Sequence, residues 1–101
     1  MAELLDAESV RDAVSVLDGW EGGPDAIVRT VGLDSFPAAI AVVDRVAEVA
    51  EEMDHHPDID IRWRTLTFRC ATHSAGGVTT RDIALANRID RIVAEAAPAP
   101  K

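Results

Sequence analysis

The stretch Glu51-Glu52-Met53-Asp54-His55-His56-Pro57 marks the point where a helical pattern stops and a strand pattern begins. The residue before a proline is pushed out of the α-helical region, so the helix must end by about His56. The third histidine of the chain, His73, lies at the far end of the next strand pattern, where a short return of the chain would bring it beside the pair. Because histidine titrates near neutral pH, three rings at one place indicate proton-transfer chemistry.

The segment before this stretch predicts a helix and a hairpin. Apolar residues recur at helical spacing over residues 7–17, with Asp6 as the N-cap and Gly19 as the stop. The turn sequence Gly22-Gly23-Pro24 follows, and β-branched residues then dominate 26–31. We therefore expect a strand on either side of this turn.

The longest predicted helix leads into the histidine pair. We expect Asp34 to be its N-cap, because Ser35, Phe36 and Pro37 suit a first helical turn. The predicted buried stripe has spacings of three and four: Phe36, Ile40, Val43, Ala47, Ala50 and Met53.

After the histidines, the apolar residues alternate in two adjoining runs. Residues 58–63 and 65–72 both show this period of two, which predicts a second antiparallel hairpin. Residues 74–77 predict a flexible turn, and Thr79 with Asp82 resembles a capping box. The last helix should reach about residue 97 and bury one stripe: Leu85, Ile89, Ile92 and Ala96.

These elements predict an α+β domain in the order α-β-β-α-β-β-α. Two hairpins form one four-stranded antiparallel sheet, and helices on one face make a two-layer structure. The chain of 101 residues has the length of a single domain, 1–101, in which 98–101 should be a frayed tail.

Composition excludes several classes of function. The formal net charge of −8 disfavours direct binding of nucleic acid, and a small molecule or a protein partner fits better. The apolar run 36–50 contains Asp44, Arg45 and Glu48, so we expect no membrane segment. The acidic N-terminal residues do not resemble a secretory signal, and the single cysteine, Cys70, suits a reducing compartment. We therefore expect a cytoplasmic protein.

Each candidate residue also has a structural interpretation. His55 and His56 could end a helix, whose C-terminus favours a positive ring by about 0.3–1 kcal/mol. A metal site with His73 and Cys70 is disfavoured, because adjacent histidines diverge and an odd spacing on a strand separates the faces. Taken alone, Asp82 suits a helix cap, and Trp63 and Cys70 suit a core.

The order and spacing of these residues favour a functional interpretation. Glu51, His55-His56-Pro57, Trp63, His73 and Asp82 together closely resemble the signature of the pterin-4a-carbinolamine dehydratase family. The similarity extends from about residue 4 to residue 97. Trp63 stands where many members of that family have tyrosine.

The resemblance implies a lyase that dehydrates 4a-hydroxytetrahydrobiopterin, the pterin-4a-carbinolamine, to quinonoid dihydropterin and so recycles tetrahydrobiopterin. It implies no metal and no cofactor, and a homodimer or homotetramer. His55 and His73 resemble the acid–base pair, and His56 resembles a third active-site residue that binds the pterin. The remaining roles are implied in the same way: Glu51 and Asp82 orient the rings, and Pro57 and Trp63 shape the pocket rim.

Two other functions stay open. The family includes a dimerisation cofactor of a homeodomain transcription factor and relatives that resemble Rubisco assembly factors. The chain could therefore be a non-catalytic binding or assembly module in the same fold. It could also bind a pterin in molybdopterin metabolism.

Overall fold

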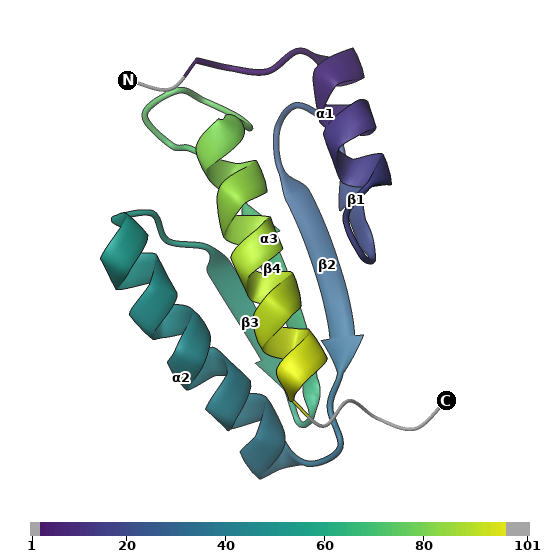
Figure 1. Cartoon of the computed structure of the whole chain (residues 1–101), viewed down its shortest axis with the longest axis vertical. Helices are drawn as coiled ribbons and strands as arrows, with labels where there is room; N and C mark the ends of the chain where they lie inside the picture. Colours follow the sequence, from purple (N-terminus) through teal and green to yellow (C-terminus); the bar gives the residue numbers. More distant parts are fainter. Residues whose placement is uncertain (1–2, 97–101) are drawn as a thin grey trace.

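The computed structural model describes residues 3–96 and has the element order predicted from sequence (Figure 1). The predicted frayed tail, 98–101, lies outside the described residues. The elements have these bounds: α1 Ala7–Ser15, β1 Trp20–Gly22, β2 Ile27–Gly32, α2 Phe36–Met53, β3 Asp58–Arg62, β4 Thr65–Cys70 and α3 Thr80–Glu95.

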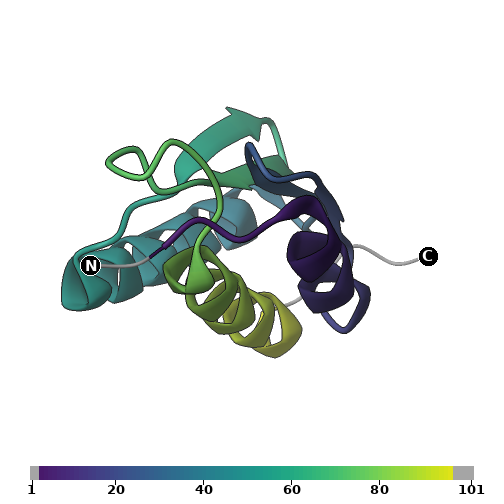
Figure 2. The ribbon, with the colours of Figure 1, turned by 90° about the horizontal axis from the view of Figure 1, so that it is seen from above.

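The four strands form one antiparallel sheet in the order β1-β2-β4-β3. Both predicted hairpins are therefore present, and β4 joins them by pairing with β2. Phe68 of β4 lies opposite Arg29 on one side and Ile59 on the other. The three helices lie on the same side of the sheet (Figure 2), which confirms the two-layer α+β prediction.

Alternate residues of β4 fill the centre of the core. Leu66, Phe68 and Cys70 are fully buried, as their period of two predicted. Helix α3 covers them with the stripe expected from sequence, since Leu85, Ile89 and Ile92 are all buried.

The predicted N-cap and buried stripe of α2 were wrong by about one residue. Ser35, not Asp34, is the N-cap, and its hydroxyl accepts from the Ala38 N–H at 3.1 Å. Phe36 is 48% exposed, and of the predicted stripe only Ala50 is fully buried. Both faces of this helix are rich in alanine and valine, so periodicity alone does not select the face that meets the sheet. The buried residues are Ala39, Val42, Val46, Val49 and Ala50.

Strand β3 ends one residue earlier than predicted, at Arg62. Trp63 has a left-handed backbone with φ of 56° and forms the turn to β4. The residue is 70% exposed, and the Arg64 guanidinium lies 4.7 Å from the centroid of its ring. Trp63 is thus a surface turn residue and not part of the core.

A carboxylate on α3 fastens the first hairpin to the helical layer. Asp90 Oδ1 accepts from Trp20 Nε1 at 2.7 Å and from Arg29 Nη1 at 2.6 Å. Its other oxygen accepts from the Asp18 N–H at 3.1 Å. These bonds join α3 to the turn between α1 and β1, to β1 itself and to β2.

Candidate active site

The three histidines line one pocket of about 280 Å³ between the C-terminal end of α2 and the loop after β4. The short return of the chain after β4 therefore brings His73 beside His55 and His56, as expected from sequence. The complete lining is His55, His56, Pro57, Asp58, Ala71, Thr72, His73, Ser74 and Arg81.

The left-handed backbone conformation of the residue that ends α2 sets the directions of the two histidine side chains. Asp54 has φ of 51° and ψ of 45°, the conformation in which many helices end, usually at glycine or asparagine. The His55 N–H donates to the Ala50 carbonyl at 3.0 Å, and the Asp54 N–H donates to Glu51 at 3.2 Å. The helix stops sharply, so His55 turns inward while His56 stays exposed.

His55 is paired with a buried carboxylate. Its Nε2 atom lies 2.5 Å from Asp82 Oδ1, and the side chains are only 7% and 0% exposed. The other oxygen of Asp82 accepts from Thr72 Oγ1 at 2.8 Å and from the Thr79 N–H at 2.9 Å. The predicted capping box is present, and its acidic residue also holds the histidine.

His56 contacts a carboxylate in a more open setting. Its Nε2 atom hydrogen-bonds Glu51 Oε2, and the two side chains are 55% and 78% exposed. An exposed pair of this kind adds little to stability, on the order of 0–1 kcal/mol. This pairing can nevertheless orient the imidazole at the pocket mouth.

His73 lies on a short loop that backbone hydrogen bonds hold in place. Thr72 and Gly77 form an isolated bridge, in which the Thr72 N–H donates to Gly77 O at 2.8 Å. The Val78 N–H donates to the Pro24 carbonyl at 2.8 Å, which ties the loop to the first hairpin turn. A Cβ atom at Gly77 would lie 2.5 Å from that carbonyl oxygen, so glycine is required there.

Of the pocket residues that were not predicted as site residues, Thr72 and Arg81 make hydrogen bonds that hold the site together. Thr72 binds the Asp82 carboxylate, and Arg81 Nη2 donates to the carbonyls of Met53 and Asp54 at 3.2 and 2.6 Å. The signal for Arg81 was present: a cation in the first turn of a helix is unfavourable for the helix dipole and so needs another reason.

Of the predicted rim residues, Pro57 lines the pocket and Trp63 does not. Trp63 lies at the opposite end of β3, in the β3–β4 turn. Cys70 is fully buried, and burial raises the pKa of its thiol. Within residues 3–96, no three histidine, cysteine or acidic side chains are grouped as a metal site requires.

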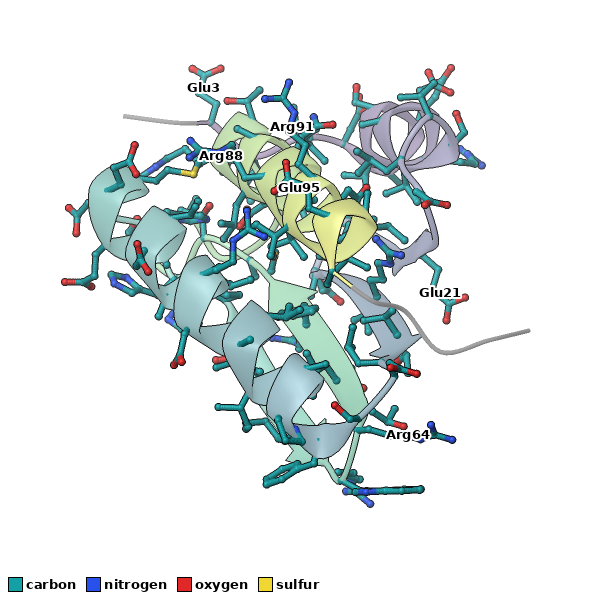
Figure 3. The ribbon with its side chains drawn as sticks, turned by 60° about the horizontal axis from the view of Figure 1, so that its bottom comes forward. Glu3, Glu21, Arg64, Arg88, Arg91 and Glu95 are labelled. Atoms are coloured by element: carbon teal, nitrogen blue, oxygen red, sulfur yellow. The ribbon has the colours of Figure 1, made fainter. Side chains whose placement is uncertain are left out.

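A second pocket of about 300 Å³ lies between α2 and α3. Figure 3 shows Arg88, Arg91 and Glu95 along the α3 side of this helix pair. Arg45 of α2 pairs with Glu95 at 2.5 Å. The lining contains both arginine and glutamate side chains and no histidine, so we place the candidate active site at the histidine pocket.

The pocket has the groups that proton transfer requires. Because Asp82 occupies Nε2 of His55, only Nδ1 of that ring remains to exchange a proton with a ligand. A buried carboxylate fixes the tautomer of an imidazole and stabilises its protonated form. His56 and His73 supply two further rings on the exposed side of the same pocket.

None of the helices between residues 3 and 96 combines the length and the apolar character that a membrane crossing needs.

Comparison with known proteins gives a consistent result. The model of the family described as pterin 4 alpha carbinolamine dehydratase matches residues 3–92. A Nocardia farcinica protein named after pterin-4-alpha-carbinolamine dehydratase is 60% identical over 90 residues, which cover 89% of this chain and 95% of that protein. A Mycolicibacterium smegmatis protein with the same name is 49% identical over 92 residues, which cover 91% of this chain and 98% of that protein.

Two solved structures share the fold. The transcriptional coactivator/pterin dehydratase of Brucella melitensis is 32% identical, with a TM-score of 0.83 over 87% of this chain and 96% of that one. A pterin dehydratase-like protein identified as a RuBisCO assembly factor in the alpha-carboxysome is 22% identical. Its TM-score is 0.60, and the match covers 72% of this chain and 84% of that one.

Proposed function

The chain belongs to the pterin 4 alpha carbinolamine dehydratase family, and we propose that it dehydrates 4a-hydroxytetrahydrobiopterin to quinonoid dihydropterin. The reaction would make it a hydro-lyase that recycles tetrahydrobiopterin. The observation that carries this proposal is the gathering of three histidines at one pocket, with His55 held by the buried Asp82.

The reaction needs an acid and a base at neighbouring atoms of one small ring system. The C4a hydroxyl leaves as water when an acid protonates it, and N5 loses its proton as the C4a=N5 bond forms. We assign these two transfers to His55 and His73, and binding of the pterin to His56. General acid–base catalysis is worth about 10²–10⁴ in rate, or roughly 3–5 kcal/mol.

The carboxylates have supporting roles in this proposal. Asp82 would keep the His55 ring in one tautomer and stabilise its charged form, and Glu51 would do the same at His56. Pro57 would shape the rim of the pocket. The exposed Trp63 lies in the β3–β4 turn, so a direct contact with the pterin would need it to come from a second copy of the chain.

The alternative is a binding or assembly module in the same fold. The Brucella melitensis relative is described as both a transcriptional coactivator and a pterin dehydratase. The buried pair of His55 and Asp82 favours an enzyme, because capping α3 accounts for the carboxylate but not for a buried imidazole that is paired with it and lines a pocket. A role with another pterin, as in molybdopterin metabolism, would use the same pocket.

We also propose a homodimer or homotetramer in the cytoplasm. β3 is an edge strand, and exposed edges are usually paired or covered. Three large apolar side chains near that edge or at the start of α2 are exposed, which supports self-association: Phe36, Ile61 and Trp63. The single cysteine suits a reducing compartment.

A stopped-flow assay of carbinolamine decay tests the proposed reaction. The purified protein should accelerate the decay of 4a-hydroxytetrahydrobiopterin at catalytic concentration, relative to buffer alone. Carbinolamines with other side chains at C6, assayed in parallel, separate biopterin from other pterins. Decay at the buffer rate with every substrate would favour the binding module.

A further inference from the structure

The bend that carries the histidines is held by two consecutive residues of α3. Asp82 binds the ring of His55, and Arg81 binds the backbone just before it. Arg81 Nη2 donates to the carbonyl of Met53 at 3.2 Å and to that of Asp54 at 2.6 Å. The first turn of α3 therefore binds both the backbone and a side chain of the segment 53–55.

The charges at the end of α2 explain why a cation is needed there. The last turn of α2 has no basic residue, although the C-terminal end of a helix dipole favours a positive charge. It instead carries Glu51 and Glu52, and Asp54 follows directly. Arg81 supplies the missing positive charge from a neighbouring helix, and it does so in the first turn of α3, where its own helix dipole opposes it.

The backbone at this point also requires support. Asp54 has a left-handed conformation that side-chain-bearing residues seldom adopt, and such residues persist where their surroundings hold them. The shorter of the two Arg81 hydrogen bonds is to the carbonyl of Asp54 itself. Arg81 is half-buried and lines the histidine pocket, so the guanidinium stabilises the bend directly beside the site.

We propose that Arg81 is a positioning residue for the histidine pair: its guanidinium holds the carbonyls of Met53 and Asp54. This contact keeps His55 against Asp82 and His56 at the pocket mouth. The kinetic part of this inference rests on the proposed dehydratase function, and the geometric part does not.

Two variants of Arg81 and one matched control test the proposal. Arg81→Met removes the guanidinium and keeps the apolar stem, and Arg81→Lys keeps a positive charge but replaces the rigid, planar donor geometry of the guanidinium with a freely rotating ammonium. The control is Arg45→Ala, because the Arg45–Glu95 pair also joins α2 to α3 but lies away from the histidines. Circular dichroism and thermal unfolding establish that each variant is folded.

The first measurement is the NMR signals of the histidine rings, which need no activity. In Arg81→Met the imidazole resonances of His55 and His56 should shift, and the His55 Nε2 proton should exchange faster with water. In Arg45→Ala they should match the wild type. Unchanged ring signals in a folded Arg81→Met protein would overturn the proposal.

The second measurement is the dehydration rate. Misplaced catalytic groups chiefly lower kcat, so Arg81→Met should lose about 10-fold in kcat with KM within about 3-fold. In Arg81→Lys, which keeps the positive charge, kcat should fall by only about 3-fold. A rise in KM with kcat kept would mean that Arg81 binds the substrate directly, which contradicts a positioning role.

The two proposals fail in different ways. A wild-type protein without activity would refute the dehydratase function, and the ring signals would still decide the role of Arg81. If Arg81→Met does not fold, Arg81→Lys decides by the same measurements. Wild-type kcat and wild-type ring signals in the lysine variant would show that a charge is sufficient and would overturn the assigned geometry.

Discussion

The Nε2 atom of His55 lies 2.5 Å from Oδ1 of Asp82, although 27 residues separate them in the chain. Asp82 is fully buried, and its second oxygen accepts from Thr72 and Thr79. One carboxylate therefore caps α3, fixes the loop after β4 and orients the histidine. Its removal should affect both stability and catalysis.

Asp82→Asn should separate these two effects when it is compared with Asp90→Asn. The amide keeps the size of the carboxylate but cannot stabilise a charged imidazole, so we expect kcat to fall by about 10-fold or more. Stability should drop by about 1–3 kcal/mol, because a buried donor loses its acceptor. Urea unfolding and the stopped-flow assay measure the two quantities.

Asp90→Asn is the matched control for this variant. Asp90 lies on the same helix and accepts from Trp20 and Arg29, away from the pocket. It should lose stability and keep the wild-type kcat in the folded protein. Equal kcat in the two asparagine variants would refute the role assigned to Asp82.

Cys70 should make stability fall at high pH. Its burial, and then the nearby charge of Asp82, raise the pKa of the thiol above its ordinary value of about 8.5. The folded protein therefore keeps a proton that the unfolded chain releases above that pH. The free energy of unfolding should decrease as pH rises beyond about 8.5, by up to roughly 1.4 kcal/mol per pH unit.

The composition makes this pH dependence easy to isolate. The chain has no tyrosine, and Lys101 is its single lysine, so few other groups titrate in this range. Urea unfolding at pH 8 to about 10.5 should show the decrease in the wild type and a flatter profile in Cys70→Ala. An equally steep decrease in both proteins would assign it to another group.

Much of this fold could be predicted because its signals are local. Residues 65–72 were predicted as a strand and Thr79 with Asp82 as a capping box, so the starts of β4 and α3 were placed correctly, although β4 ends at Cys70, two residues earlier than predicted. The buried face of α2 was not, since valine and alanine occur on two faces of that helix and only contact with the sheet distinguishes them. Trp63 was misplaced for a similar reason: its left-handed backbone is a property of the turn.

The candidate site also has a part that could be predicted from the sequence and a part that could not. The spacing of His55, His56 and His73 predicted that they lie close together, because the antiparallel β3–β4 hairpin brings the chain back to the end of the sheet where β3 begins. The partners of these rings depend on how α3 packs against the end of α2. Arg81 was missed because its partners are backbone carbonyls: its unfavourable place in the first turn of α3 signals a role but does not identify these partners.

We expect the protein to associate through its exposed apolar side chains. Ile61 is 42% exposed on the edge strand β3, and Trp63 follows it in the next turn. Light scattering at micromolar concentration should give a mass of two or four times 10.8 kDa. Ile61→Lys should lower that mass, whereas Val16→Lys, on the 85% exposed Val16 after α1, should not. A wild-type species of 10.8 kDa alone contradicts self-association.

Activity should survive exhaustive chelation. The proposed mechanism uses imidazole protons, and the resemblance to the family implies no metal. Dialysis against a strong chelator, followed by the stopped-flow assay, should leave kcat unchanged. Elemental analysis that finds about one zinc per chain, with activity lost on its removal, would require a metal-assisted mechanism instead.

Replacing each of the three histidines by alanine should have different kinetic effects. His55 and His73 are proposed to exchange protons in the transition state, and loss of such an interaction lowers kcat and kcat/KM together. We expect each variant to lose about 10-fold or more in kcat. His56 is proposed to hold the bound pterin, so His56→Ala should chiefly raise KM.

The double variant His55→Ala/His73→Ala provides the decisive comparison. Two acids near one hydroxyl can partly replace each other, so a single variant can retain activity that the double variant loses. We expect the double variant to be much slower than either single variant, with folding confirmed by circular dichroism. Because Asp82 would then lie buried without its His55 partner, the double variant should also be less stable than His73→Ala. Near wild-type dehydration by a folded double variant would remove the basis for acid–base catalysis at this pocket, and a binding module would then explain the family resemblance better.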